Sequence, residues 1–503
     1  MKQAVTGGQM KMLDSYTIQK IGIPSLVLME RAALSVYQAL LEENFSLDKV
    51  LVICGGGNNG ADGVAVARML CIKGYSADVC ILGNIEHFTE EMCRQTQIAE
   101  NCHVSFVKNP DMSEYTTIVD AIFGVGLSRE PEGVYRDIIL QINASGVPVM
   151  AVDIPSGVSC DTGKILGCAV KARMTVTFAF HKTGLLFYPG ASCAGKIQVA
   201  DIGICRMPEN EFELSVYTCD EADMFRIPAR KPEGNKGTYG KVFLASGSRD
   251  ISGAAYLSAC AAMRTGAGMV KVHTREESRK TLAALLPEAM FSFYGEDSIR
   301  KEEIRTCLNW ADVYGVGQGL GTSQQAEDIL YTILAEGTKP LLIDADALNL
   351  LAGRMEVLAN YPAPVIVTPH LGEFSRISGV SVEKWKEAPL YATKRFASKY
   401  RVITVCKDAR TVISDGGDDI YINTTGNSGM ATAGSGDVLG GIILGLMAQG
   451  MTPKDAAAVG AWLHGYAGDM AAADKGEYSL LAGDIINWTG EILKKRGQIN
   501  EDT

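Results

Sequence analysis

Histidine is scarce in this chain of 503 residues, its cysteines are not clustered, and positive charge is in deficit. The six His and 13 Cys residues form no Cys-x-x-Cys pair and no Cys/His cluster, so neither a zinc site nor a disulfide framework is predicted. Lys and Arg number 47 against 58 Asp and Glu, which leaves a net charge of -11. Because no basic surplus exists to neutralise phosphates, we expect no nucleic-acid partner.

Long apolar runs are also missing. No stretch has 18 consecutive apolar residues free of Gly and charge, so no membrane helix is predicted. The first residues, MKQAVTGGQMKMLD, lack the apolar core of a signal peptide. The longest apolar run, at 438–447, predicts a buried helix. We therefore expect a cytoplasmic protein with reduced thiols and no membrane partner.

Glycine is abundant, with 54 residues, and the length predicts two to four domains. In the first half, short apolar runs such as LVICGGG and PVMAVDIPSG alternate with helical patterns. This alternation predicts a parallel α/β sheet covered on both faces, with a ligand crevice beyond the carboxyl ends of its strands. The polar residues and glycines expected there are Asn58, Asn59, Asp62, Asp120, Gly124, Gly126, Asp153 and Ser156.

A second α/β alternation starts after a polar, charged segment whose last part, RKPEGNKGTYG, is rich in Pro, Gly and Lys. We interpret this segment, 216–235, as a linker between an N-terminal domain at 1–215 and a C-terminal domain at 236–503. Strand patterns such as KVFLASGS and RVITVCKDARTVI are followed by a helical last third. The two halves are not copies of each other, which indicates fusion of unrelated domains.

The loop NTTGNSGMATAGSGDVLGG places Gly434 and Gly436 around Ser435, directly before Asp437 and a predicted helix. Small residues and a helix N-terminus let backbone N–H groups hold an anion. A carboxylate there can accept the proton of a substrate hydroxyl during phosphoryl transfer. A second interpretation makes Asp437 only the N-cap of the helix.

The G-x-G-D loop resembles that of the ribokinase-like superfamily. KGTYGKVFLASGSRDISGAAYLSACAAMRTGAGMVKV, GVGQGLG, LLIDADALN, VTPHLGE, the 407–411 run and NTTGNSGMATAGSGDVL resemble, in this order, ADP/ATP-dependent NAD(P)H-hydrate dehydratases across 236–490. The resemblance implies a ribokinase-like α/β domain that uses Mg²⁺ with ADP or ATP. It implies a catalytic Asp437, which also contacts substrate, and further substrate contacts at Ala254, Gly319 and His370. Nucleotide contacts would be Lys407, Asp408, Ala409, Arg410, Thr411 and Gly436.

For several residues in this half, a purely structural role is an alternative to a role in the site. His370 follows an apolar strand. It is either a substrate contact or a structural residue whose imidazole is hydrogen-bonded within the protein. Asp344 and Asp346 in LIDADALN are as compatible with helix capping as with catalysis, and we leave both out of the site. The family pattern has Pro after Asn427, whereas this chain has Ser428, which predicts a slightly looser loop.

Asn59, Asp120 and Ser156 are hard oxygen donors that follow three different strands. Such donors suit an alkali or alkaline-earth cation, although oxygen-bearing residues are also common in turns. Asp62 equally suits a helix cap.

NNGADG, VDAIFGVGLSREPEG, VDIPSGVSCDTG and TVTFAFHKTGLLFYPG resemble the NAD(P)H-hydrate epimerase domain across about 1–215. The resemblance implies a Rossmann-like, three-layer parallel domain with K⁺ at Asn59, Asp120 and Ser156. It also implies that Asp153 is the catalytic proton shuttle and a substrate contact. The other substrate contacts would be Asn58, Asn59, Gly60, Ala61, Asp62, Gly124, Val125, Gly126, Leu127, Ser128, Arg129 and Glu130.

Ala61 departs from the family pattern, which has Gly at this position. If the backbone needed a positive φ there, the methyl group would strain the loop. Otherwise the substitution is tolerated.

The two resemblances together predict repair of hydrated NADH and NADPH (NADHX and NADPHX). The N-terminal domain would interconvert the R and S hydrates, and the C-terminal domain would dehydrate the S form with ADP or ATP. The alternative is a kinase for a small alcohol, such as a vitamin or sugar, with a non-catalytic N-terminal binding module. A homo-oligomer is expected by resemblance only.

Overall fold

The computed structural model describes residues 1–205, 215–295 and 300–498, and the chain forms two compact units. The N-terminal unit is Gln3–Val216, and the C-terminal unit is Tyr217–Thr503 together with Met1–Lys2. No helix in the described ranges is long and apolar enough to cross a membrane.

The N-terminal unit is built on a seven-stranded, all-parallel sheet with the order β4-β3-β2-β5-β6-β7-β9. Because the chain order reverses between β2 and β5, a crevice is expected at the carboxyl ends of these two strands. The strands are β2 (Val50–Cys54), β3 (Ala77–Ile81), β4 (Ser105–Phe106), β5 (Thr117–Ala121), β6 (Val149–Val152), β7 (Met174–Phe178) and β9 (Lys196–Ala200).

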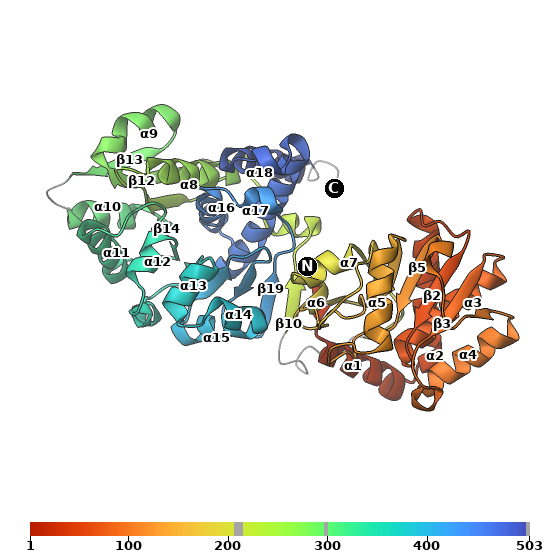
Figure 1. Cartoon of the computed structure of the whole chain (residues 1–503). Coiled ribbons are helices and arrows are strands. Elements are labelled where there is room, and N and C mark those ends of the chain that lie inside the picture. Colours follow the sequence, from red (N-terminus) through yellow and green to blue (C-terminus); the bar gives the residue numbers. More distant parts are fainter. Residues whose placement is uncertain (206–214, 296–299, 499–503) are drawn as a thin grey trace. The chain divides into compact units, whose positions relative to one another are not determined.

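Helices cover both faces of this sheet (Figure 1). Alternate residues of β2 point to opposite faces, with Val52 in one core and Leu51 in the other. On the Val52 face lie α2 (Ser25–Glu42), α3 (Asn58–Ile72) and α4 (Glu90–Asn101), and on the Leu51 face lies α5 (Val134–Ser145). The predicted parallel, three-layer α/β architecture is confirmed.

The first helix of this unit, α1 (Gly7–Ser15), is attached at its start. Thr6 caps it in a reciprocal pair with Gln9, and the Gly7 amide donates to the Asp161 carboxylate over 2.6 Å. The strand before it, β1 (Lys2–Val5), pairs in parallel with β8 (His181–Lys182). After α1 the chain continues as one π-helical turn, Tyr16–Ile21.

The C-terminal unit is built on a second sheet with the order β13-β12-β11-β14-β15-β16-β17-β18-β19. The strands are parallel from β13 to β17, and β18 and β19 are antiparallel additions. They are β11 (Lys241–Ala245), β12 (Met269–Arg275), β13 (Met290–Tyr294), β14 (Val313–Val316), β15 (Leu341–Ile343), β16 (Val365–Val367), β17 (Ile403–Cys406), β18 (Val412–Ser414) and β19 (Asp419–Ile422).

One face of this sheet packs against α8 (Ser252–Thr265), α16 (Ser435–Ala448), α17 (Pro453–Lys475) and α18 (Ala482–Gln498), which lie together in Figure 1. The apolar run at 438–447 is buried in α16, as predicted. Helix α16 approaches α8 closely because it carries glycines: a Cβ on Gly441 would lie 2.3 Å from the Ser258 carbonyl oxygen.

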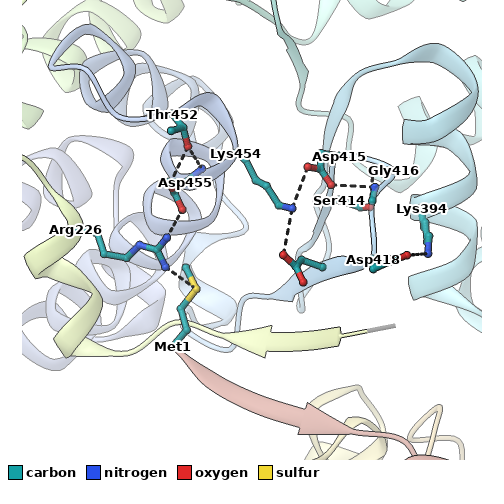
Figure 2. Close-up of polar contacts among 12 residues, drawn as sticks. Met1, Arg226, Lys394, Ser414, Asp415, Gly416, Asp418, Thr452, Lys454 and Asp455 are labelled. Atoms are coloured by element: carbon teal, nitrogen blue, oxygen red, sulfur yellow. Dashed lines mark hydrogen bonds and ion pairs between the residues drawn. The ribbon is translucent and has the colours of Figure 1, made fainter. Parts of the chain in front are cut away.

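The segment interpreted as a linker is partly folded onto the C-terminal unit. It contains a 3₁₀ helix at Glu221–Arg226, and Met224 and Ile227 are buried in the core of that unit. Arg226 pairs with Asp455 at the start of α17 (Figure 2). The apolar residues explain the difference from the expected linker, because their burial stabilises an ordered segment despite the polar residues around them.

An ion pair also attaches the β18–β19 hairpin to α17. The Lys454 ammonium lies 2.9 Å from Asp415 and 3.6 Å from Asp419 (Figure 2). This hairpin follows β17 directly, so the pair helps to hold the edge of the sheet next to the residues at 407–411.

Candidate active sites

A cleft of about 600 Å³ opens in the N-terminal unit at the junction of β2 and β5. Its lining includes most of the substrate contacts predicted for this domain, which come from the ends of β2, β5 and β6. These residues are Asn58, Asn59, Asp62, Gly124, Val125, Gly126, Leu127, Ser128, Arg129 and Asp153. The size and the mixed lining suit part of a nucleotide-like ligand.

Asp153 lines this cleft in a left-handed backbone conformation, with φ of 66°. Its Oδ1 accepts a hydrogen bond from Thr177 over 3.0 Å and lies 2.7 Å from the Lys182 ammonium. Lys182 is only 1% exposed and also donates to the Phe178 carbonyl over 2.7 Å. Such strain in a non-glycine residue beside a buried ion pair is typical of functional sites.

Sequence reasoning missed three charged residues of this cleft, Lys182, Asp14 and Lys11. Lys182 ends the mostly buried segment TVTFAFHK. A lysine in such a segment is the feature of the sequence that could have identified it as a site residue. Asp14 lies on α1, and nothing near it in the sequence marks it as functional. Burial raises the pKa of Asp14 to about 6 and raises the pKa of Asp62 well above its usual range.

Two of the three predicted K⁺ ligands are in direct contact. Asp120 is fully buried, and its carboxylate accepts hydrogen bonds from the Ser156 amide (2.8 Å) and hydroxyl (2.6 Å). Burial raises the pKa of Asp120 to about 6, and no cation in the described ranges pairs with it. Asn59 has its Oδ1 beside Gly124, and its buried amide nitrogen has no protein partner.

Gly60, Ala61 and Glu130 do not line the cleft. Gly60 packs against backbone, since a Cβ there would lie 1.8 Å from the Gly55 carbonyl oxygen. Ala61 is buried within α3 and is not among the residues with positive φ. The helical backbone therefore accepts a methyl group at 61 without strain.

This geometry predicts that Ala61→Gly destabilises the N-terminal unit by about 1–2 kcal/mol. About 1 kcal/mol comes from the lower helix propensity of glycine, and the lost burial of one methyl group adds about 0.8 kcal/mol. Thermal or urea unfolding of the full chain, followed in the transition of this unit, measures the effect.

Ala144→Gly on the exposed face of α5 is the matched control, because it changes helix propensity without removing a buried methyl. Equal stability of Ala61→Gly and wild type would show that alanine is strained at position 61.

The C-terminal unit places Asp437 in the first turn of α16, after Gly434 with φ of 89°. Burial, together with the nearby negative charges of Asp344 and Asp346, raises the pKa of Asp437 to about 7, although Lys407 acts in the opposite direction. Asp437 makes no capping hydrogen bond, because the N-cap position belongs to Gly434. The interpretation of Asp437 as a mere N-cap is therefore wrong.

Lys407 directs its ammonium toward the head of α16. A Cβ on Gly436 would lie 3.3 Å from the Lys407 Nζ, and the same ammonium lies 3.0 Å from the Asp344 carboxylate. Burial lowers the pKa of Lys407, but Asp344 and the other carboxylates nearby raise it above its usual value overall. A helix N-terminus with a lysine ammonium beside it is a suitable site for a phosphoryl group.

Asp344 and Asp346, which we left out of the site, are part of this arrangement. Asp344 is 1% exposed and is the ion-pair partner of Lys407. Asp346 accepts a hydrogen bond from the Gly321 amide over 2.8 Å and thereby fixes the loop after β14. The signal that could have found Asp344 is its position directly after β15, at the edge where the other site residues lie.

His370 is used structurally through one ring nitrogen. Its Nδ1 accepts from the Gly372 and Glu373 amides, and Glu373 accepts from the His370 amide, which caps α13 (Leu371–Ser378). The side chain remains 57% exposed. A backbone bridge joins His370 to Lys407, so the ends of β16 and β17 lie side by side.

The other predicted contacts of this domain lie near the same sheet edge. A Cβ on Gly319, after β14, would lie 2.8 Å from the Ala254 Cβ in α8, so these two positions are adjacent. Arg410 donates to the Thr424 carbonyl over 2.8 Å. Asp408, Ala409 and Thr411 complete the turn from β17 into β18, and the Thr411 hydroxyl donates to the Asp408 carbonyl.

The loop before α16 is held by Asp469 of α17. Its carboxylate accepts from the Gly426 amide and from the Asn427 side chain, each over 2.9 Å. Ser428, which replaces the family's proline, contacts Glu477. These contacts oppose the loosening that we predicted from the loss of the proline ring.

Comparison with known proteins matches both halves of the chain to families. Residues 242–489 match the family described as NAD(P)H-hydrate dehydratase, and residues 25–184 match the family described as YjeF-related protein N-terminus. The bifunctional NAD(P)H-hydrate repair enzyme Nnr of Moorella thermoacetica is 36% identical over 97% of this chain and 96% of its own length. This chain belongs to the family of bifunctional NAD(P)H-hydrate repair enzymes.

Two further relatives of this repair-enzyme chain each match only one of its halves. The NAD(P)H-hydrate epimerase of Oenococcus oeni is 53% identical over 40% of this chain and 96% of its own length. A ribokinase-like superfamily protein from Enterococcus faecalis, known from its crystal structure, is 32% identical over 56% of this chain and 97% of its own, with a TM-score of 0.50. The predicted fold class and family are confirmed.

Proposed function

We propose that this chain repairs hydrated NADH and NADPH in two steps. The N-terminal unit interconverts the R and S hydrates, and the C-terminal unit dehydrates the S hydrate with ADP or ATP. The observation that carries the proposal is the arrangement at the head of α16, where Asp437 lies in the first helical turn and the Lys407 ammonium lies beside Gly436. Family membership of the whole chain supports the same function.

In the C-terminal unit, the residues supply the two requirements of phosphoryl transfer. Asp437 accepts the proton of the substrate hydroxyl, and the amides at the start of α16 with the Lys407 ammonium stabilise charge on the transferred group. The phosphorylated oxygen then leaves as phosphate while the lone pair of the ring nitrogen forms a C=N bond. Loss of a proton from the adjacent ring carbon forms the ring C=C bond and returns the lone pair to nitrogen. NAD(P)H is the product.

Mg²⁺ suits this site as a partner of the nucleotide. No group of three His, Cys, Asp or Glu side chains that could hold a metal exists in the described ranges. Asp437, Asp344 and Asp346 are nevertheless close enough to affect one another electrostatically. Mg²⁺ in such sites is held by substrate phosphates with one or two carboxylates, and it would neutralise phosphate charge here.

In the N-terminal unit, Asp153 moves the proton and K⁺ would bind at Asn59, Asp120 and Ser156. The fit of a cation is supported by the buried Asp120 carboxylate, which has only neutral hydrogen-bond donors around it. A monovalent cation would compensate that charge. The loop at 124–130, next to Asn59, would then be held for substrate binding.

The deciding experiment is recovery of the dihydronicotinamide absorbance from NADHX and NADPHX. We expect recovery with ADP or ATP and none without nucleotide. A stable phosphorylated product of a vitamin or sugar, with no recovery from the hydrates, would favour the alternative kinase function instead.

We also propose that the chain works in the cytoplasm as a homo-oligomer. All 13 cysteines are free thiols, which suits a reducing compartment. Light scattering of the purified chain tests the oligomeric state.

A further inference from the structure

The cleft of the N-terminal unit contains more carboxyl groups than its buried cation can balance. Asp14, Asp62 and Asp153 all line it, and Lys182 is the only buried cation among the lining residues that the structure describes. Lys11 and Arg129, which also line the cleft, are exposed. Because these carboxyl groups are buried or partly buried, at least one of them is expected to hold a proton.

Asp153 and Asp14 differ in their ion-pair and hydrogen-bond partners, which suits them to different roles in proton transfer. Asp153 is ion-paired to Lys182 over 2.7 Å and accepts from Thr177. The Asp14 carboxyl forms no hydrogen bond within the described ranges. Burial raises its pKa to about 6, with Asp153 contributing in the same direction and Lys182 in the opposite one. An ion-paired carboxylate and a partly buried carboxyl group without a hydrogen-bond partner in the described ranges, in one cleft, are a suitable base and acid pair.

Helix α1 holds Asp14 in a defined place relative to Asp153. Met10, Asp14 and Ile18 recur every four residues, and all three line the cleft. The Gly7 amide binds Asp161, and the strand before α1 pairs Val5 with Lys182, the same lysine that contacts Asp153. Lys182 therefore connects the two carboxyl groups: its backbone pairs with the strand that leads into α1, and its side chain binds Asp153.

We propose that Asp14 is a second catalytic residue of the epimerase, the acid that acts opposite Asp153 on the hydrated ring. This inference rests on the proposed epimerase function. The carbon that changes configuration carries a hydroxyl and is bonded to the ring nitrogen, so loss of water leaves a planar iminium. Water returning on the other face gives the opposite epimer.

The protons and electrons balance over these two steps. Asp14 donates its proton to the hydroxyl, the C–O bond breaks, and the nitrogen lone pair forms the C=N bond as water leaves. A water molecule then adds to the opposite face of that carbon, the C=N electrons return to nitrogen, and Asp153 takes the proton of the added water. The enzyme now has an ionised Asp14 and a protonated Asp153, the state that converts the other epimer back.

The test is epimerisation by Asp14→Asn in the full chain, measured by chiral separation or NMR of the two hydrates. We expect kcat/KM to fall at least 100-fold, since general acids contribute about 10²–10⁴-fold. Asp14→Glu, which keeps an acid, should recover at least tenfold over Asp14→Asn. Asp137→Asn, which removes an exposed carboxylate on α5, is the matched control and should match wild type.

Two readouts separate catalysis from a structural role. The wild-type kcat/KM should fall as the pH rises above about 6, because Asp14 is active only while protonated, and Asp14→Asn should lack this fall. The other charged residues of the cleft remain in both proteins: Lys11, Asp62, Arg129, Asp153 and Lys182. In H₂¹⁸O, each inversion by wild type should place one solvent oxygen in the product.

Three outcomes would overturn the assignment of Asp14. They are an Asp14→Asn rate within threefold of wild type, a pH profile that this substitution leaves unchanged, and inversion without solvent oxygen. If Asp14→Asn fails to fold, an Asp14→Glu variant that is folded but whose kcat/KM does not fall as the pH rises would equally count against it. Failure of the proposed function gives a different result, because wild type itself would then not accelerate inversion.

Discussion

Asp437→Asn is expected to abolish nucleotide-dependent recovery of NAD(P)H. The substitution keeps the size of the side chain but removes the proton acceptor, and since positioned bases contribute about 10²–10⁴-fold, turnover should fall by about a thousandfold or more. It also removes a negative charge beside Lys407 and Asp344, so nucleotide binding should be retained or strengthened. Absorbance recovery at saturating ADP or ATP measures the first effect, and calorimetric titration with nucleotide measures the second.

The pH dependence of the dehydration rate is a second test of the role of Asp437. The pKa of Asp437 is raised to about 7, and only the carboxylate can accept a proton. The wild-type dehydration rate should therefore increase as the pH rises through about 7 and become constant above it. Epimerisation by the same polypeptide is the internal control, and it should be unchanged in Asp437→Asn. Wild-type dehydration by this variant would remove the main support for the phosphoryl-transfer chemistry.

Asp153→Asn is expected to stop enzymatic epimerisation while dehydration of the S hydrate continues. Asparagine tolerates the left-handed conformation that Asp153 adopts, so the backbone can stay in place. The variant should consume only the S fraction of a mixed hydrate preparation rapidly, and the R fraction should follow at the uncatalysed rate. Wild type should consume both fractions in one phase, so the amplitude of the fast phase is the measurement.

This substitution also leaves the buried Lys182 without its partner, which costs about 3–5 kcal/mol when a buried ion pair loses one member. The N-terminal unit should therefore unfold at a lower temperature than in wild type, and the assay belongs well below that transition. A single phase at the wild-type rate in Asp153→Asn would show that Asp153 is not the proton shuttle.

In both experiments, the presence of two units in one chain provides an internal control. Each substitution lies in one unit, and the activity of the other unit reports the amount of intact chain in the assay. The predictions for Asp14 and Asp153 are also distinguishable. Asp14→Asn retains the Asp153–Lys182 ion pair and should leave stability close to wild type, whereas Asp153→Asn breaks that pair.

The sequence by itself determined the fold class, the two-part organisation and the sheet edges where most of the predicted site residues lie. Strand-and-helix alternation is a local property, and glycine-rich turns at strand ends identify the edge where ligands bind. Asn58, Gly124 and Asp153 line the cleft for that reason, and Asp437 heads α16 as the G-S-G-D loop indicated. Ala61 shows the limit of local reasoning, because only its helical φ removed the concern about strain.

The tertiary structure alone decided which charges meet. Asp14 enters the epimerase cleft because α1 folds over it, and Lys182 pairs with Asp153 although 29 residues separate them along the chain. Asp344 pairs with Lys407, and His370 uses one nitrogen as a helix cap. Electrostatic and hydrogen-bond energies depend on distance and burial in space, and a linear pattern of residue types contains neither quantity.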